Sequence, residues 1–250
     1  MKDKKKTLKI LGLVAVILAI ILTVMYRLVR TKTIVLNSLV INRDTEVVGV
    51  DVSEFQETID MSVLKQQGIQ FVIIRATEGS SYQDVCFAEN WKNARDSGLL
   101  RGAYHFFSFD SSGASQALNF INTVRELRGD MVPFVDVEYY GDKRSNPPEK
   151  EDVISELKVY LDALEDYYGV KPVIYCSAEI SKQYIDGNFD EYQKWFRNVY
   201  EPFSAMFNRD WIIWQYCDTA VLEGYYGGEK YIDLDVLNSR YTLEDIIINN

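Results

Sequence analysis

The sequence predicts an α/β protein: a shortened, irregular β/α (TIM-like) barrel preceded by one transmembrane helix. Three observations lead to this prediction. An uncharged apolar stretch lies near the N-terminus, eight short β-rich runs follow it, and helical patterns fill the gaps between the earlier runs but not the last ones. With 250 residues, of which 47% are hydrophobic and 26% charged, the chain is long enough for one globular domain and a tail.

The first predicted element is a transmembrane helix over residues 10–29. The seventeen residues from Ile10 to Tyr26 carry no charge. At about 1.5 Å per residue they span roughly 26 Å, the short end of a bilayer crossing. Residues 1–9 are rich in lysine, so the positive-inside rule predicts a cytoplasmic tail and a domain on the far side of the membrane. A cleaved signal peptide is the alternative, although no small-x-small cleavage site follows the apolar stretch.

A linker at residues 30–46 leads into a domain at residues 47–250. Many of its predicted strands are almost continuously apolar, as in a sheet that is buried on both faces. The predicted strands are Val47–Val52, Phe71–Ala76, Gly102–Phe107, Val132–Glu138, Val173–Ser177, Trp195–Tyr200, Trp211–Tyr216 and Tyr231–Val236. The predicted helices are Ile59–Gln67, Cys86–Ser97, Ala114–Val124 and Val153–Tyr168, with room for a fifth between Ala178 and Tyr192.

The later connections differ from the earlier ones. Residues 201–210 separate the sixth and seventh strands, and the gap before the eighth contains three glycines and no helical period. A parallel crossover usually needs a dozen or more residues and often a helix. We therefore expect a barrel that begins as β/α units and finishes with plain strands. A doubly wound open sheet is the alternative, but no glycine-rich phosphate-binding motif supports it.

The composition limits the kinds of catalytic chemistry that are open to this chain. The sequence has one histidine, His105, and three cysteines that are far apart. A histidine-rich metal site is excluded, and any Ser-His-Asp or Cys-His catalysis would have to use His105. The 37 acidic residues point to carboxylate chemistry instead. Because the basic residues concentrate before residue 33, the rest of the chain is strongly acidic and disfavours a nucleic-acid partner.

Acidic residues gather at predicted strand ends, where barrel enzymes carry their working groups. The alternation of a strand puts Asp136 and Glu138 on one face, with Cα atoms roughly 6.6 Å apart. Two carboxyl groups whose pKa values are pushed apart are what glycosidic cleavage requires. An incidental strand end or a divalent-metal ligand pair are the alternatives for this motif. The full set of strand-end acids is Asp51, Glu78, Asp136, Glu138, Asp233 and Asp235.

Aromatic residues accompany these acids. Tyr104, Tyr175 and Trp214 lie in the predicted strands, and flat rings that stack on sugar faces are expected in a saccharide cleft. Packing of the barrel core or of the helices is the alternative for half or more of all such rings. Alternation places His105 on the face opposite Tyr104, so we expect a structural or substrate-positioning role for it rather than proton transfer.

Several segments, in chain order, resemble glycoside hydrolase family 25, the Chalaropsis-type lysozymes. The resemblance covers about residues 47–240, and the ordered set of motifs is more specific than any one of them. The matching segments are Gly49-Val50-Asp51-Val52-Ser53-Glu54-Phe55-Gln56, Phe71 to Gly79, Gly102-Ala103-Tyr104-His105-Phe106, Asp136-Val137-Glu138, Trp195 to Tyr200, Trp214-Gln215-Tyr216 and Asp233-Leu234-Asp235.

The resemblance implies a barrel of five β/α units followed by three strands, and hydrolysis of the β-1,4 bond between N-acetylmuramic acid and N-acetylglucosamine in peptidoglycan. By motif position, Glu138 is similar to the general acid of the family. Asp136 matches the carboxylate that assists attack by the acetamido group of the substrate, and Asp51 and Asp233 match the remaining cleft acids. The substrate contacts expected are Tyr104, His105, Tyr175, Trp214 and Glu78. The resemblance implies no metal and no cofactor.

Two departures from the family pattern add negative charge near the expected cleft. Glu57 stands where the family often has a glycine, and Asp235 where it commonly has an asparagine. The alternatives for both are a further rise in the pKa of the acid or mere solvation. We expect a muramidase anchored in a bacterial cell membrane, with its catalytic domain on the outer side; the sequence names no protein partner. A weakly catalytic peptidoglycan-binding module is the alternative function. Another barrel glycosidase, such as a chitinase, is less favoured because Val132–Glu138 lacks the longer acidic run of chitinases.

Overall fold

The computed structural model describes residues 2–35, 37–200, 206 and 209–249. Its sheet closes into an eight-stranded barrel, as predicted, and a two-residue strand β3 (Tyr82–Gln83) pairs with it from outside. The barrel strands are β1 (Val48–Val52), β2 (Phe71–Glu78), β4 (Leu100–Phe106), β5 (Phe134–Asp136), β6 (Val173–Ser177), β7 (Lys194–Arg197), β8 (Ile213–Ala220) and β9 (Ile232–Leu237).

Seven barrel strands run parallel and the last runs against them. Parallel pairing continues from β1 to β8, and β9 lies antiparallel between β8 and β1, which closes the sheet. The expectation that plain strands follow the β/α units is confirmed, although β8 is still parallel to β7. Much of the connection between these two strands, residues 201–205 and 207–208, lies outside the described residues.

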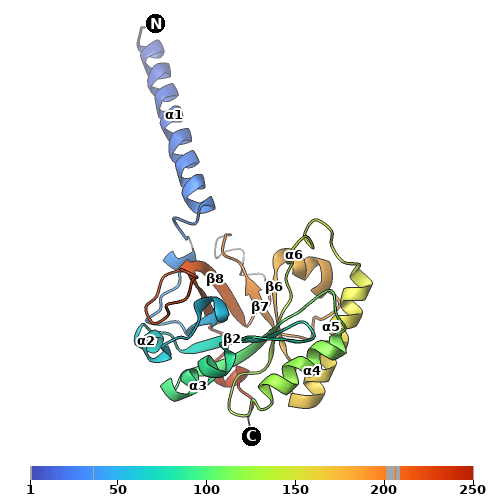
Figure 1. Cartoon of the computed structure of the whole chain (residues 1–250). Coiled ribbons are helices and arrows are strands. Elements are labelled where there is room, and N and C mark those ends of the chain that lie inside the picture. The colour runs from blue at the N-terminus through green and yellow to red at the C-terminus, as the bar shows by residue number, and fades with distance from the viewer. Residues whose placement is uncertain (1, 36, 201–205, 207–208, 250) are drawn as a thin grey trace.

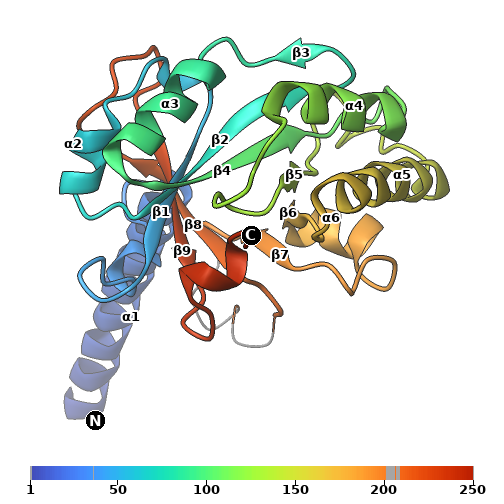
Figure 2. The ribbon, with the colours of Figure 1, turned by 90° about the horizontal axis from the view of Figure 1, so that it is seen from below.

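Helices surround the barrel in the order predicted. Figure 2 shows them around the outside of the strands when the barrel is seen from below. The expected fifth helix is a short segment, α6, that continues as one π-helical turn at Ser181–Ile185. The helices of the barrel are α2 (Met61–Gln66), α3 (Phe87–Ser97), α4 (Gly113–Val124), α5 (Lys150–Tyr168) and α6 (Ala178–Ile180).

Local signals in the sequence explain where these helices begin and end. The side chain of Asp60 accepts hydrogen bonds from the first backbone N–H groups of α2, and Ser112 does the same for α4. Gly98 and Gly169 end α3 and α5 in the left-handed conformation that glycine adopts without steric cost.

Strand alternation divides the core into two parts. One face of each strand packs outward against the helices, as Val72 and Ile74 of β2 do. The other face fills the barrel interior, where Phe71 and Ile73 meet Phe134. These interior side chains occupy one end of the barrel and leave the end at which the parallel strands finish open to the site described below.

The chain before the barrel is dominated by one long helix, α1 (Lys2–Arg30), which projects away from the barrel (Figure 1). Its segment Thr7–Arg30 is long and apolar enough to cross a membrane by length and composition, and that window is not buried against the barrel. The boundaries predicted between the basic tail (1–9), the span (10–29) and the linker (30–46) stay predictions.

A glycine at the start of α4 allows α4 to approach α5. A Cβ atom at Gly113 would lie 1.9 Å from the carbonyl oxygen of Glu156, which is backbone and cannot turn aside. We expect Gly113→Ala to lower the free energy of unfolding by about 2 kcal/mol through overpacking, measured by urea unfolding of the full chain in detergent. The control is Gly228→Ala, where nothing lies within 4 Å of the added atom. Equal stability of the two variants would contradict this account.

Candidate active site

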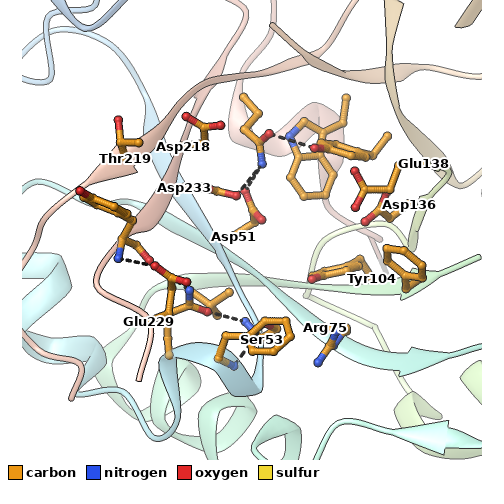
Figure 3. Close-up of a pocket in the computed structure, with 18 of the residues that line it drawn as sticks. Asp51, Ser53, Arg75, Tyr104, Asp136, Glu138, Asp218, Thr219, Glu229 and Asp233 are labelled. Atoms are coloured by element: carbon orange, nitrogen blue, oxygen red, sulfur yellow. Dashed lines mark hydrogen bonds between the residues drawn. The ribbon is translucent and has the colours of Figure 1, made fainter. Parts of the chain in front are cut away.

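A cavity of about 600 Å³ opens at the end of the barrel where the parallel strands finish (Figure 3). Each of the eight barrel strands contributes a side chain to it. The contributions are Asp51 from β1, Arg75 from β2, Tyr104 and Phe106 from β4, Asp136 from β5 with Glu138 just beyond it, Tyr175 from β6, Trp195 from β7, Gln215 and Asp218 from β8, and Asp233 from β9.

The structure brings together all four residues predicted to be catalytic. Asp51, Asp136, Glu138 and Asp233 line this one cavity. Asp233 reaches the cavity because of the direction of β9, which the sequence did not predict. Because β9 is antiparallel, its beginning lies beside the end of β1, and Asp233 is the cross-strand partner of Asp51.

Of the predicted substrate contacts, Tyr104 and Tyr175 line the cavity, but His105 does not. His105 faces outward from the barrel and is fully buried beneath the helices. Its Nδ1 lies 2.7 Å from Oγ1 of Thr77, its Nε2 lies 3.0 Å from Oε1 of Gln116, and its ring stacks on Tyr160. Burial lowers the pKa of His105 to about 4, so the ring is neutral near pH 7. The structural role expected for it fits this position, and the substrate contact does not.

Trp214 and Glu78 also lie outside the cavity lining. Trp214 points outward from β8, is fully buried, and donates a hydrogen bond from its Nε1 to the backbone oxygen of Asn198 at 2.8 Å. Glu78, at the end of β2, leaves 45% of its side chain exposed outside the cavity, where it lies 3.7 Å from Arg75. Neither side chain is placed to contact a substrate in the cavity.

Gln215 is the residue that the sequence reasoning missed. Its Nε2 donates hydrogen bonds to Oδ2 of Asp51 at 2.8 Å and to Oδ2 of Asp233 at 3.1 Å. Its Oε1 accepts a hydrogen bond from the hydroxyl of Tyr175 at 2.9 Å. Alternation along Trp214-Gln215-Tyr216 contained the signal, because two outward aromatic residues place the glutamine between them inward.

Burial governs the protonation of the cleft carboxyls. It raises the pKa of Glu138, against the opposing charges of Arg197 and Arg144. Burial also raises the pKa of Asp136 well above its ordinary value, and the neighbouring Glu138 and Asp51 raise it further. A carboxyl group that keeps its proton toward neutral pH can act as a general acid.

Asp136 has one oxygen available for a ligand. Its Oδ1 is buried and has no hydrogen-bond partner among the residues that the structure describes. A buried acceptor without a partner is unusual, and it is expected where a substrate supplies the missing donor. The described residues contain no group of three or more His, Cys, Asp or Glu side chains that could hold a metal ion.

The family model described as glycosyl hydrolases family 25 matches residues 50–225. The chain belongs to glycosyl hydrolase family 25. The family predicted from the sequence motifs is thereby confirmed, and with it the assignment of the chain as a glycoside hydrolase.

Individual relatives and solved structures are similar to this chain over most of its length. The chain is 34% identical over 203 residues to the uncharacterised protein YegX of Escherichia coli K12, covering 79% of this chain and 71% of that one. A family 25 glycosyl hydrolase from Bacillus anthracis has a similar structure, with a TM-score of 0.72 and 43% identity over 78% of this chain and 91% of that one. A lysozyme from Streptomyces coelicolor has a TM-score of 0.68 and 26% identity over 78% and 93% of the two chains.

Asp235 lies deeper in the barrel than the cavity acids. Because β9 descends from the cavity, Asp235 lies below Asp233, fully buried, and accepts a hydrogen bond from Nε1 of Trp195 at 2.7 Å. The structure thus places it away from solvent rather than solvated. Burial, together with Asp233, raises the pKa of Asp235 to about 7, and the charge of Asp235 in turn helps to raise the pKa of Asp51.

The raised pKa of Asp235 makes stability depend on pH. The folded carboxyl keeps its proton up to about pH 7, whereas the unfolded one loses it near about pH 4, so the stabilisation is lost as the pH rises through 7. We expect Asp235→Asn, which cannot ionise, to raise the Tm at pH 8.5 by about 2 °C or more and to change it less at pH 4.5. Asp166→Asn on exposed α5 surface is the control. The same Tm difference at both pH values would count against this assignment.

Proposed function

We propose that this enzyme hydrolyses the β-1,4 bond between N-acetylmuramic acid and N-acetylglucosamine in peptidoglycan, with Glu138 as the general acid. The observation that carries the proposal is the pairing of Glu138, whose pKa is raised by burial, with Asp136, whose Oδ1 lacks a partner, in one cavity. The description of the Streptomyces coelicolor relative as a bacterial lysozyme supports it.

In this mechanism the substrate supplies the nucleophile. Asp136 accepts the N–H of the 2-acetamido group, which orients the acetamido oxygen for attack on the anomeric carbon. As that C–O bond forms, the glycosidic C–O bond breaks and Glu138 gives its proton to the leaving oxygen. Water then attacks the anomeric carbon of the cyclic intermediate, the acetamido group is restored, and the Glu138 carboxylate takes the proton of the water.

Asp51 and Asp233 hold and polarise the substrate in this scheme. Gln215 fixes both carboxyls in one arrangement through its amide nitrogen. Tyr175, which the same glutamine orients, and Tyr104 present aromatic surface to sugar rings. The expected cofactor requirement is none, since every step uses side chains of the cavity and water.

The decisive variant is Glu138→Gln, which keeps the shape of the side chain and removes the acidic proton. We expect it to lower kcat on purified peptidoglycan by about 10²- to 10⁴-fold, because a positioned general acid contributes that much. Reduced products identified by mass should carry N-acetylmuramic acid at the new reducing ends. Glu78→Gln, the same change outside the cavity, is the control and should leave kcat within about twofold.

Equal release by wild type and Glu138→Gln would remove the acid role from Glu138 and redirect attention to Asp51 and Asp233. Binding to peptidoglycan without release by any variant would favour the alternative, a wall-binding module. The presence of all four cleft acids argues against that alternative, because a binding module has no need for buried carboxyls with raised pKa values.

We also propose that α1 anchors the enzyme in the cell membrane, with one crossing and the barrel on the outer, extracytoplasmic side. The apolar window of α1 has a mean hydropathy of 2.8, and it makes no buried contact with the barrel. A helix that is apolar on all sides and unpacked is stable in lipid rather than in water. This placement puts the cleft on the side where peptidoglycan lies.

The anchor makes a direct prediction for bacteria that express the full chain. The protein should stay in the membrane pellet after an alkaline carbonate wash, and protease added to spheroplasts should degrade the barrel. Residues 33–250 expressed with a cleavable signal peptide are the soluble control. A mature protein whose first residue lies beyond Tyr26 would identify the segment as a cleaved signal peptide instead.

A further inference from the structure

The segment that joins α1 to the barrel enters the cavity. Thr31 and Lys32 line the same cavity as Asp51 and Glu138, although they precede β1 by more than a dozen residues. Both residues lie before residue 50, where the match to the family model begins. This part of the cavity wall therefore lies outside the segment that the family model matches.

The chain turns at Lys32, directly after the C-terminal end of α1. The backbone N–H of Thr33 donates to the oxygen of Leu28 at 2.9 Å, and that of Lys32 donates to the oxygen of Val29 at 3.0 Å. These two bonds make a Schellman motif, in which the residue after the helix cap adopts a left-handed conformation and is most often glycine. Here that residue is Lys32, with φ at 55°. A lysine kept where glycine is less strained suggests that its side chain has a use.

The Lys32 ammonium group lies within an ion-pair network at the cavity. It pairs with Oδ2 of Asp218, which also accepts a hydrogen bond from Arg197 at 2.8 Å, and it lies 5.3 Å from the centre of the Tyr200 ring. The side chain of Lys32 is 28% exposed, so part of the ammonium group can still take a further acceptor.

The other cation of the cavity wall is already engaged. Arg75 donates to Glu54 at 2.8 Å and to Asp84 at 2.9 Å, and its side chain is 7% exposed. Among the cavity-lining residues that the structure describes, Lys32 is the cation with room for a ligand. The same wall contains six carboxyl groups, from Asp51, Asp136, Glu138, Asp218, Glu229 and Asp233.

An acidic cleft and a substrate that carries carboxylates repel each other unless a cation intervenes. We propose that Lys32 binds a carboxylate of the glycan, so that the segment leaving the membrane helix completes the substrate cleft. The inference rests on the proposed peptidoglycan substrate, whose carboxylates belong to the lactyl group of N-acetylmuramic acid or to the attached peptide. Lys32 is a binding residue in this proposal and takes no part in bond cleavage.

The test separates charge from structure by replacing Lys32 with glycine, which suits the left-handed position and removes the cation. Dissociation constants are measured by calorimetry in the Glu138→Gln background of the full chain, in detergent, so that no turnover is needed. The ligands are soluble peptidoglycan fragments, peptide-free glycan with free lactyl groups, and both after amidation of their carboxyls.

We expect Lys32→Gly to weaken binding of the carboxylate-bearing ligand by about three- to tenfold and to leave binding of the amidated ligand unchanged. Lys32→Arg should bind like Lys32, and Lys230→Gly, which removes an exposed lysine beside the cavity-lining Glu229 and Tyr231, should have no effect. If Lys32→Gly binds the peptide-free glycan more weakly, Lys32 binds the lactyl carboxylate. If only the peptide-bearing fragments bind more weakly, Lys32 binds a carboxylate of the peptide.

Unchanged binding of Lys32→Gly, or an equal loss for native and amidated ligands, would overturn the proposal. Kinetics with Glu138 intact give an independent check: Lys32→Gly should raise KM by the same factor and leave kcat within about twofold. Wild type that binds these ligands but cleaves none of them would contradict the proposed hydrolysis, while the dissociation constants would still decide the role of Lys32.

Discussion

The concentration of carboxyl groups at one end of a closed barrel is the constraint on which the rest of this structure depends. Asp51, Asp136, Glu138 and Asp233 are removed from water, which penalises their charged forms and raises the pKa of each. Neutral hydrogen-bond donors offset part of that cost: Gln215 serves two of these acids, and the indole of Trp195 serves Asp235 below them. The polar groups at the open end of the barrel hold in place acids that would otherwise repel one another.

The direction of β9 decides which acids become available to a ligand. In a parallel barrel the later residue of a strand lies nearer the open end, but β9 runs the other way. Asp233, near its start, therefore reaches the cavity, and Asp235, two residues on, is carried down beside Gly49 and Gln215. Two acids in one short motif thus have different environments, and one strand reversal accounts for the difference.

Patterns local in the sequence predicted most of this arrangement. Periodicity identified all eight barrel strands and four of the helices, and the alternation of Asp136 with Glu138 placed both in the cleft. Alternation also places Gln215 inward between two outward aromatic residues and His105 opposite Tyr104, whereas the expectation of rings stacked on sugars pointed to Trp214 as a substrate contact. The return of Lys32 to the cavity depends on its contact with Asp218, which is distant in the chain, and periodicity does not register such a contact. Strand β3 is only two residues long, which is too short for a period to show.

The position of Lys32 also links the proposed membrane anchor to the part of the cell wall that the enzyme can reach. Only Thr31 separates Lys32 from the end of α1, and an extended residue spans at most about 3.6 Å, so the cavity wall begins within roughly 10 Å of the helix end. A helix that spans the bilayer would then hold the cleft beside the membrane surface, with no flexible spacer to let it search the wall. A mobile tether between the membrane helix and the barrel would have to leave the cleft complete when it extends. Here Thr31 and Lys32 form part of the cleft wall, so extension of this segment would remove that part of the wall. The glycan accessible to such an enzyme is the part that lies against the membrane.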